Sequence, residues 1–158
     1  MFRELSRKNK MISVEECAEL LTVEKRGTLA VNGDGGYPYA MPMNHYYNEC
    51  DGCIYFHCGK AGHRLDSLLR SDKASFCVCE QGTREAGDWA FTVRSVVVFG
   101  RIEIIDDPAE IREITAALSR KFTDDEQYIN TEIENYLRAT LLLKLTPEHI
   151  RGKRVKEN

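Results

Sequence analysis

Four basic side chains stand close together in the segment 54–64 of the chain: His57, Lys60, His63 and Arg64. The pattern of this segment is typical of a buried strand, a glycine-containing turn and a helix that begins near Gly62. The first turn of a helix has backbone N–H groups without partners and the positive end of the helix dipole. Basic side chains oppose that dipole, so an anion bound among them is the simpler explanation. We therefore predict a phosphate site, and we expect a cofactor to carry the phosphate because the chain has no other concentrated anion site.

Composition narrows the possible partners. The chain has 158 residues, 42% of them hydrophobic, and we expect one domain over residues 1–158. A net charge of −3, with both signs scattered along the sequence, argues against nucleic acid as a partner. No apolar run is long enough to cross a bilayer, and the basic segment 1–10 leads into a helix start rather than into the apolar centre of a signal peptide. We expect a cytoplasmic protein with no membrane partner, whose six cysteines are thiols.

Three helices besides the one near Gly62 have clear start signals. Ser13 and Glu16 form a capping box. The helix that it opens has an apolar face of Val14, Cys17, Ala18 and Leu21. Asp107 followed by Pro108 predicts a second helix start. Its helical period continues through Ile111, Ile114, Leu118 and Phe122. A third helix is expected over residues 124–138, with an inward face of Ile129, Ile133, Tyr136 and Leu137.

The rest of the chain is dominated by short strands. We expect them at residues 27–32, 38–47, 53–57, 74–80, 89–93, 95–105 and 141–145. The strand region 89–105 should be broken or bent near Arg94 and again at Gly100. Pro42 cannot donate to a ladder, so its strand lies at a sheet edge or carries a bulge. Six or seven strands joined by turns, with helices at the rim, predict a mainly β fold, a small antiparallel β-barrel with peripheral helices.

Four segments occur in an order that resembles one family. They are 36–45 (GYPYAMPMNH), 54–57 (IYFH), 62–66 (GHRLD) and 94–100 (RSVVVFG). The chain is similar in this order to the pyridoxamine 5′-phosphate oxidase-like, FMN-binding split-barrel proteins, and within them most to the Nim group of 5-nitroimidazole resistance proteins. The basic first ten residues and the ending at 152–154 also fit. The resemblance covers nearly the whole chain and implies a split β-barrel homodimer, with FMN in grooves between the two subunits.

The resemblance also implies a set of cofactor-binding residues. Along the flavin ring it places Met43, Asn44, His45 and Tyr46. Around the ribityl phosphate it places His57, His63 and Arg64, beside Lys60 and Gly62 of the turn. Ser95, or a neighbour on that strand, would approach from the dimer interface. Two positions depart from the family: many members have lysine at the place of Arg64, and His63 stands where arginine or lysine is frequent, so phosphate affinity would depend on pH.

The implied activity is that of a flavin-dependent oxidoreductase. FMN would take a hydride from a nicotinamide or another donor and reduce a small organic acceptor such as a nitroimidazole. The sequence has no short phosphate-cradling motif for a nicotinamide dinucleotide, so the donor would bind transiently or be another protein. His45 is a hypothetical proton donor, because the unperturbed pKa of histidine lies near neutrality. His57 fits a core histidine as well as a phosphate or substrate contact.

Two other functions stay open at this point. The first is a flavin or haem binder on the same fold that catalyses nothing. The second is a zinc protein, because Cys50-x-x-Cys53, His57 and Cys58 are followed by Cys77-x-Cys79. The spacing disfavours zinc: the first pair flanks a turn, and the last pair shares one strand face, as core residues do. We therefore expect no metal site and interpret the cysteines as small buried thiols. Trp89 and Phe91 are expected in the barrel or in the dimer interface.

Overall fold

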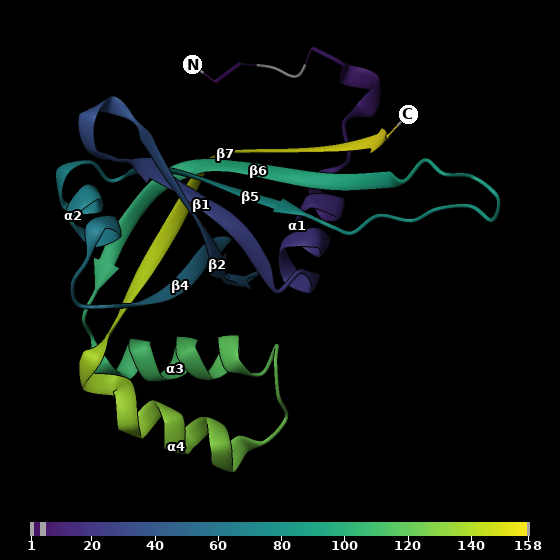
Figure 1. The fold of residues 1–158 in the computed structure, drawn as a ribbon. Coiled ribbons are helices and arrows are strands. Elements are labelled where there is room, and N and C mark those ends of the chain that lie inside the picture. The colour runs from purple at the N-terminus through teal and green to yellow at the C-terminus, as the bar shows by residue number, and fades with distance from the viewer. Residues whose placement is uncertain (1, 4–5, 158) are drawn as a thin grey trace.

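The computed structural model describes residues 2–3 and 6–157. Its centre is an antiparallel sheet of seven strands in the order β2-β1-β5-β6-β7-β4-β3. The strands are β1 (Arg26–Asn32), β2 (Pro38–Asn44), β3 (Tyr46–Asn48), β4 (Cys53–Gly59), β5 (Lys73–Cys79), β6 (Thr92–Ile105) and β7 (Thr140–Lys156). The sheet curls into a half-barrel (Figure 1). This arrangement confirms the prediction of a mainly β, antiparallel split barrel, and β2 with its Pro42 is an edge strand as expected.

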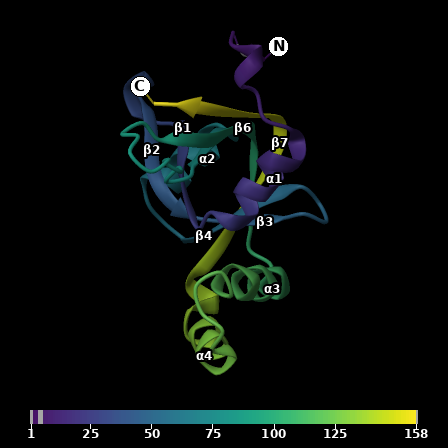
Figure 2. The same cartoon turned by 90° about the vertical axis from the view of Figure 1, so that its right-hand side faces the viewer.

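Helices surround the barrel. They are α1 (Val14–Val23), α2 (His63–Arg70), α3 (Pro108–Ser119) and α4 (Glu126–Tyr136), with short 3₁₀ turns at Lys8–Lys10, Asp34–Gly36 and Leu137–Ala139. Figures 1 and 2 show α3 and α4 as a helical hairpin that projects from one end of the barrel. None of the helices in the described part of the chain is long and apolar enough to cross a membrane.

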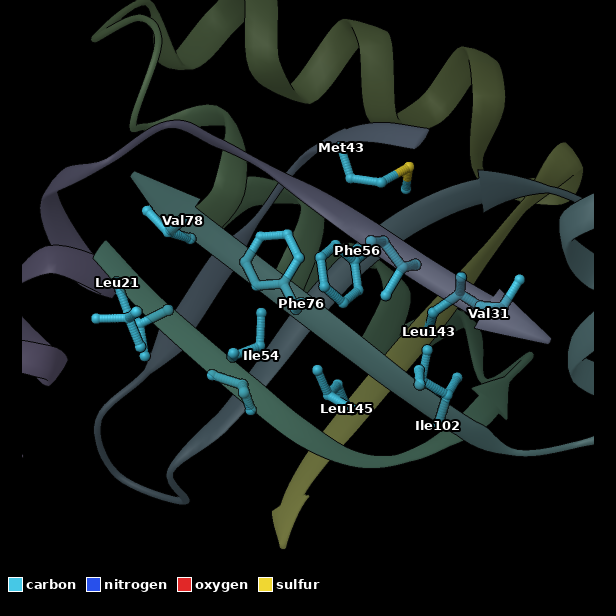
Figure 3. Close-up of a cluster of buried hydrophobic side chains, with 14 of the residues drawn as sticks. Leu21, Val31, Met43, Ile54, Phe56, Phe76, Val78, Ile102, Leu143 and Leu145 are labelled. Carbon is cyan, nitrogen blue, oxygen red and sulfur yellow. The ribbon is translucent and has the colours of Figure 1, made fainter. Parts of the chain in front are cut away.

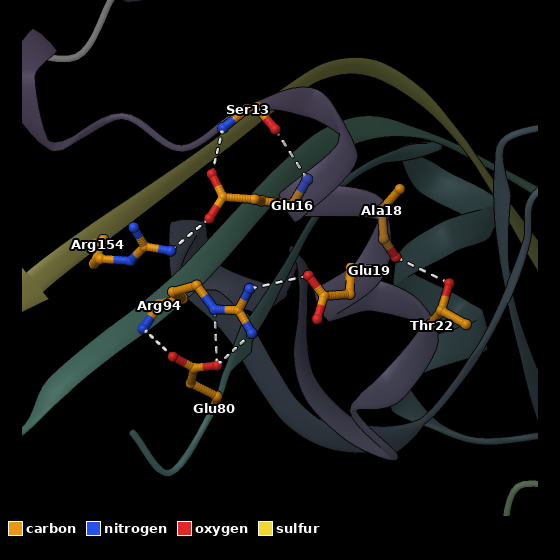
Figure 4. Close-up of polar contacts among 8 residues, drawn as sticks. All are labelled: Ser13, Glu16, Ala18, Glu19, Thr22, Glu80, Arg94 and Arg154. Carbon is orange, nitrogen blue, oxygen red and sulfur yellow. Dashed lines mark hydrogen bonds and ion pairs between the residues drawn. The ribbon is translucent and has the colours of Figure 1, made fainter. Parts of the chain in front are cut away.

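The predicted helix starts are present. Ser13 Oγ accepts from the N–H of Glu16 at 3.2 Å, and the Glu16 carboxylate accepts from the N–H of Ser13 at 3.1 Å (Figure 4). Glu16 also pairs with Arg154 of β7, so the cap ties α1 to the end of the sheet. The buried face of α1 differs from the prediction: Leu20 is buried, whereas Val14 at the first helical position is exposed, because that turn lies beyond the edge of the core.

The core fills the inside of the curl. Phe56 of β4 and Phe76 of β5 are fully buried and pack edge to face, with ring centroids 4.9 Å apart (Figure 3). Leu21 of α1 closes one side of this cluster, and Leu143 and Leu145 of β7 another. A second, smaller cluster joins α3 to the barrel through residues that include Ile111 and Leu142. The hairpin is therefore anchored mainly by α3.

Three strand predictions were wrong. The expected strand 38–47 is interrupted at His45, whose backbone N–H donates to Lys25 instead of a neighbouring strand. The segment 89–93 is no separate strand, since β6 begins at Thr92 and runs through Arg94 without a break. The last strand continues to Lys156, well beyond Leu145. Both long strands persist because they pair with each other along their length, from Thr92 opposite Lys156 to Ile105 opposite Leu142.

The bend that was expected at Gly100 is present as a bulge against β7. The register of the β6–β7 pair shifts between Phe99 and Gly100. A Cβ atom at Gly100 would collide with the carbonyl oxygen of Thr146. The close approach of the two backbones therefore requires glycine at this position.

Candidate functional site

A pocket of about 740 Å³ lies between the barrel and the α3–α4 hairpin. Strands β2 and β4 and the start of α2 form its barrel wall, which carries Met43, Asn44, His57, Cys58 and Arg64. The hairpin forms the opposite wall, which carries Thr115, Ser119, Tyr128, Glu132 and Tyr136. The volume is in the range of small-molecule sites, of the order of 300–1,000 Å³. The predicted residues Met43, Asn44, His57 and Arg64, which come from β2, β4 and α2, thus meet at one pocket.

Arg64 is the main cation of the barrel wall. Its Nη1 donates to the sulfur of Met43 at 2.8 Å, and a thioether is a weak acceptor. Its Nε is buried and has no hydrogen-bond partner in the described part of the chain. No carboxylate of the described residues forms an ion pair with its guanidinium. A half-buried guanidinium with spare donors favours an anionic ligand.

The N-terminus of α2 adds backbone donors beside Arg64. Gly62 is the N-cap with a φ of 123°, a conformation that favours glycine, and no side chain caps this helix end. The N–H groups of the first helical turn are therefore not satisfied by a capping side chain. Together with the helix dipole they make the start of α2 favourable to negative charge.

His57 and Cys58 stand next to Arg64 at the end of β4. Loss of hydration in the pocket, and then the charge of Arg64, lower the pKa of His57. Neutral imidazole is thus favoured at neutral pH, with one donor and one acceptor nitrogen. Burial raises the pKa of the Cys58 thiol, although Arg64 opposes that shift. Cys58 therefore stays a neutral thiol, which suits neither a nucleophile nor a zinc ligand.

His45 lies in the core and does not line the pocket. Its side chain is fully buried, Nε2 donates to the carbonyl of Leu21 at 2.8 Å, and the ring packs edge to face on Phe76. Burial, followed by the nearby charge of Lys121, lowers the pKa of His45 to about 4. A neutral core histidine of this kind gives no support to the hypothesis of a proton donor. Tyr46, the next predicted residue, packs on the small cluster beneath α3.

The other two basic residues of the turn point elsewhere. His63 Nε2 lies 3.2 Å from a carboxylate oxygen of Asp34, and its ring stacks on Tyr39. Lys60 Nζ lies 2.6 Å from a carboxylate oxygen of Asp106. Both carboxylates come from distant loops, so adjacency in sequence could not predict these pairs. Neither residue lines the pocket, and neither does Ser95, which lies opposite Cys79 and Lys153 in the sheet.

The cysteines offer no metal site. Among the residues that the structure describes, no group of three or more His, Cys, Asp and Glu side chains is placed to hold a metal ion. All six cysteines are free, and Cys50, Cys77 and Cys79 are exposed, so the interpretation as buried thiols was wrong for these three. Cys77 and Cys79 do share a strand face, but it is the outer one, because Phe76 and Val78 fill the core.

Sequence reasoning missed the hairpin wall. Tyr128, Glu132 and Tyr136 were placed on a helix, but nothing connected that helix with the turn at Arg64. The available signal was their four-residue spacing, which puts all three on one face of α4.

A curled antiparallel sheet of seven strands with a few peripheral helices is the arrangement of a split-barrel protein. The model of the pyridoxamine 5′-phosphate oxidase family matches residues 13–154. The chain therefore belongs to this family. No curated protein matched it by sequence.

Solved structures share the fold. A conserved hypothetical protein of Mycobacterium tuberculosis superposes with a TM-score of 0.81 at 18% identity, covering 95% of this chain and 89% of that one. A protein of Bacteroides thetaiotaomicron, whose description proposes a role in 5-nitroimidazole antibiotic resistance, gives 0.77 at 19%, covering 93% and 87%. The FAD and haem binding protein of Mycobacterium smegmatis gives 0.73 at 24%, covering 94% and 74%. These neighbours include flavin-binding proteins, and at such identities they establish the fold alone.

Proposed function

We propose that this protein is a flavoprotein that binds FMN in the pocket between the barrel and the α3–α4 hairpin. One observation carries the proposal: Arg64 lines this pocket with a buried, unpartnered Nε and no carboxylate beside it among the described residues. Arg64, His57 and the N–H groups at the start of α2 would hold the phosphate. The family of the chain supports the same cofactor.

The barrel wall also suits the flavin ring. The outer edge of β2 has no strand beside it in the described sheet, so backbone groups near Met43 and Asn44 are free to bind the polar edge of the ring. Bound FMN would supply the redox chemistry itself. The residues of the chain would hold the ring, and the hairpin would limit the access of water.

We further propose that the protein is an oxidoreductase acting on small organic acceptors, nitroimidazoles or other nitroaromatics among them. A nicotinamide or a protein would donate the electrons, and a homodimer would complete the cofactor groove. The cytoplasm is the proposed location, in keeping with six free cysteines. The Bacteroides protein shares this fold, and its proposed role is in 5-nitroimidazole resistance. That proposed role is what supports nitroimidazoles as acceptors, because the fold alone does not define a substrate.

The test begins with a visible absorption spectrum after addition of FMN and desalting. We expect retained flavin bands, and an Arg64→Ala variant that binds FMN about ten- to a hundredfold more weakly, since a charge-assisted hydrogen bond contributes about 1.5–3 kcal/mol. Arg70→Ala is the matched control, because Arg70 lies on the same helix but pairs with Asp34 outside the pocket. Failure of the wild-type protein to retain FMN, or equal affinity of the two variants, would contradict the proposal.

Turnover separates an enzyme from a binder. The FMN-loaded protein is reduced and then mixed with a nitroimidazole. Reoxidation that is faster than in air alone is the result expected for an oxidoreductase. If the protein retains flavin but no acceptor reoxidises it faster than air does, the protein binds flavin without catalysing this reaction.

A further inference from the structure

The hairpin wall of the pocket has a pattern of its own. Tyr128, Glu132 and Tyr136 recur every four residues along α4, and all three line the pocket. The tyrosines are 57% and 60% exposed, unusual for such large aromatic side chains. Each phenol ring therefore stands one helical turn from the Glu132 carboxylate, on the same face of the helix.

Glu132 differs from the other glutamates that flank it on α4. Glu126 pairs with Arg120 at 2.6 Å, and Glu134 pairs with Arg112 at 2.6 Å. Glu132 has neither an ion pair nor a hydrogen bond from its side chain to any residue that the structure describes. Among the described residues that line the pocket, Glu132 is thus the one acidic group, while Arg64 carries the positive charge on the barrel wall.

We propose that Tyr128, Glu132 and Tyr136 bind a planar aromatic cation as the second ligand of this pocket. The inference deepens the proposed function and rests on it, because the ligand would lie against the flavin held on the barrel wall. A carboxylate between two aromatic rings attracts a cation by charge and by cation–π contacts. A flat ring fits because it must lie between the hairpin and a flat cofactor. The phosphate of the cofactor is kept at the opposite wall by Arg64, so charge separates the two ligands.

The inference is tested with three probes that share one ring and differ in charge. They are 1-methylnicotinamide (a cation), nicotinamide (neutral) and nicotinate (an anion). Each is titrated into the FMN-loaded protein by calorimetry. We expect the cation to bind about tenfold more tightly than the neutral ring, because the Glu132 carboxylate and the cation–π contacts both favour it. The anion should bind most weakly.

Two variants assign the preference to one side chain. Glu132→Gln keeps the shape of the wall and removes its charge, so it should reduce the preference for the cation to the part that the two tyrosines contribute and leave nicotinamide binding unchanged. Glu134→Gln is the matched control, because it removes one negative charge from the same helix outside the pocket. It should preserve the preference for the cation.

The possible failures are distinct. A wild-type protein that retains no FMN would overturn the proposed function and this inference with it. A protein that retains FMN normally but binds none of the probes, or binds all three alike, would overturn the inference alone. Equal effects of Glu132→Gln and Glu134→Gln would also overturn it, because the preference would then come from the general field of the helix.

Discussion

Nearby carboxylates determine which of the basic side chains at the β4–α2 turn can bind an anion. Lys60 and His63 each meet an aspartate from another loop, and both lie at the surface. Arg64, one residue beyond His63, pairs with no carboxylate among the described residues and donates to the thioether of Met43. Its spare donors make it the group that we propose to bind the phosphate. Replacing Arg64 should accordingly affect the pocket, whereas replacing Lys60 should affect a surface ion pair that contributes little to stability.

His45 should make stability depend on pH. Its pKa is about 4 in the folded protein and near 6.5 when unfolded, so folding favours the neutral form. The contribution is complete above pH 6.5 and is lost as the pH falls toward 4, by about 3 kcal/mol in total. Urea denaturation at pH 7.5 and pH 4.5 measures the change in the free energy of unfolding.

The control for His45 is His45→Gln, whose amide can still donate toward Leu21 but does not titrate. We expect this variant to lose less stability between the two pH values than the wild-type protein. Identical losses would show that other groups cause the pH dependence.

At the scale of elements, the pocket depends on the contact between two parts of the fold, the barrel and the α3–α4 hairpin. The barrel supplies the edge of β2 and the start of α2, and the hairpin supplies α3 and α4. Lys121, just after α3, fastens the hairpin by donating to the backbone carbonyls of Glu24 and His45. The interruption of the sheet at His45 frees the second of these carbonyls. The break between β2 and β3 thus positions both walls of the pocket.

The β6–β7 bulge should be intolerant of a side chain. Gly100→Ala would force its methyl group against the carbonyl oxygen of Thr146, and overpacking of this kind costs about 1–3 kcal/mol. Gly59→Ala is the matched control, because a Cβ at Gly59 meets no atom within 4 Å. Urea denaturation of both variants measures the cost. A free energy of unfolding for Gly100→Ala no lower than that of the control would contradict the expected clash.

At the scale of the molecule, the exposed aromatic side chains fit an interface between two copies. Trp89 is 71% exposed in the segment before β6, and Phe91 and Phe99 are exposed nearby in sequence. Outward-facing apolar groups of this size on a protein surface are typical of interaction sites. The proposed homodimer would cover part of this surface.

Trp89 is a direct probe of the dimer, because the chain has one tryptophan. We expect a sedimentation coefficient that corresponds to a dimer, and a tryptophan emission maximum that shifts to the blue as dilute protein is concentrated. The shift would follow from the transfer of the indole out of water. A monomer at all concentrations would contradict the proposed dimer, and a dimer without the shift would place Trp89 outside its interface.

Much of the fold could be predicted because its signals are local. The capping box at Ser13, the start at Asp107 and Pro108, and the edge position of Pro42 each follow from a few neighbouring residues. Where a non-local pairing outweighs a local signal, prediction was wrong. The segment 152–156 has a basic and polar composition typical of a tail, yet it completes β7 because β6 supplies its hydrogen bonds.

The sequence by itself determined the class of fold, the family and the turn that carries Arg64, since these depend on residue order and on periodicity. The tertiary structure alone decided which basic residues face a pocket, that His45 is a core residue, and that α4 forms the second wall. Those outcomes depend on distances between segments far apart in the chain. A contact such as that between His63 and Asp34 exists only once folding has brought both segments together.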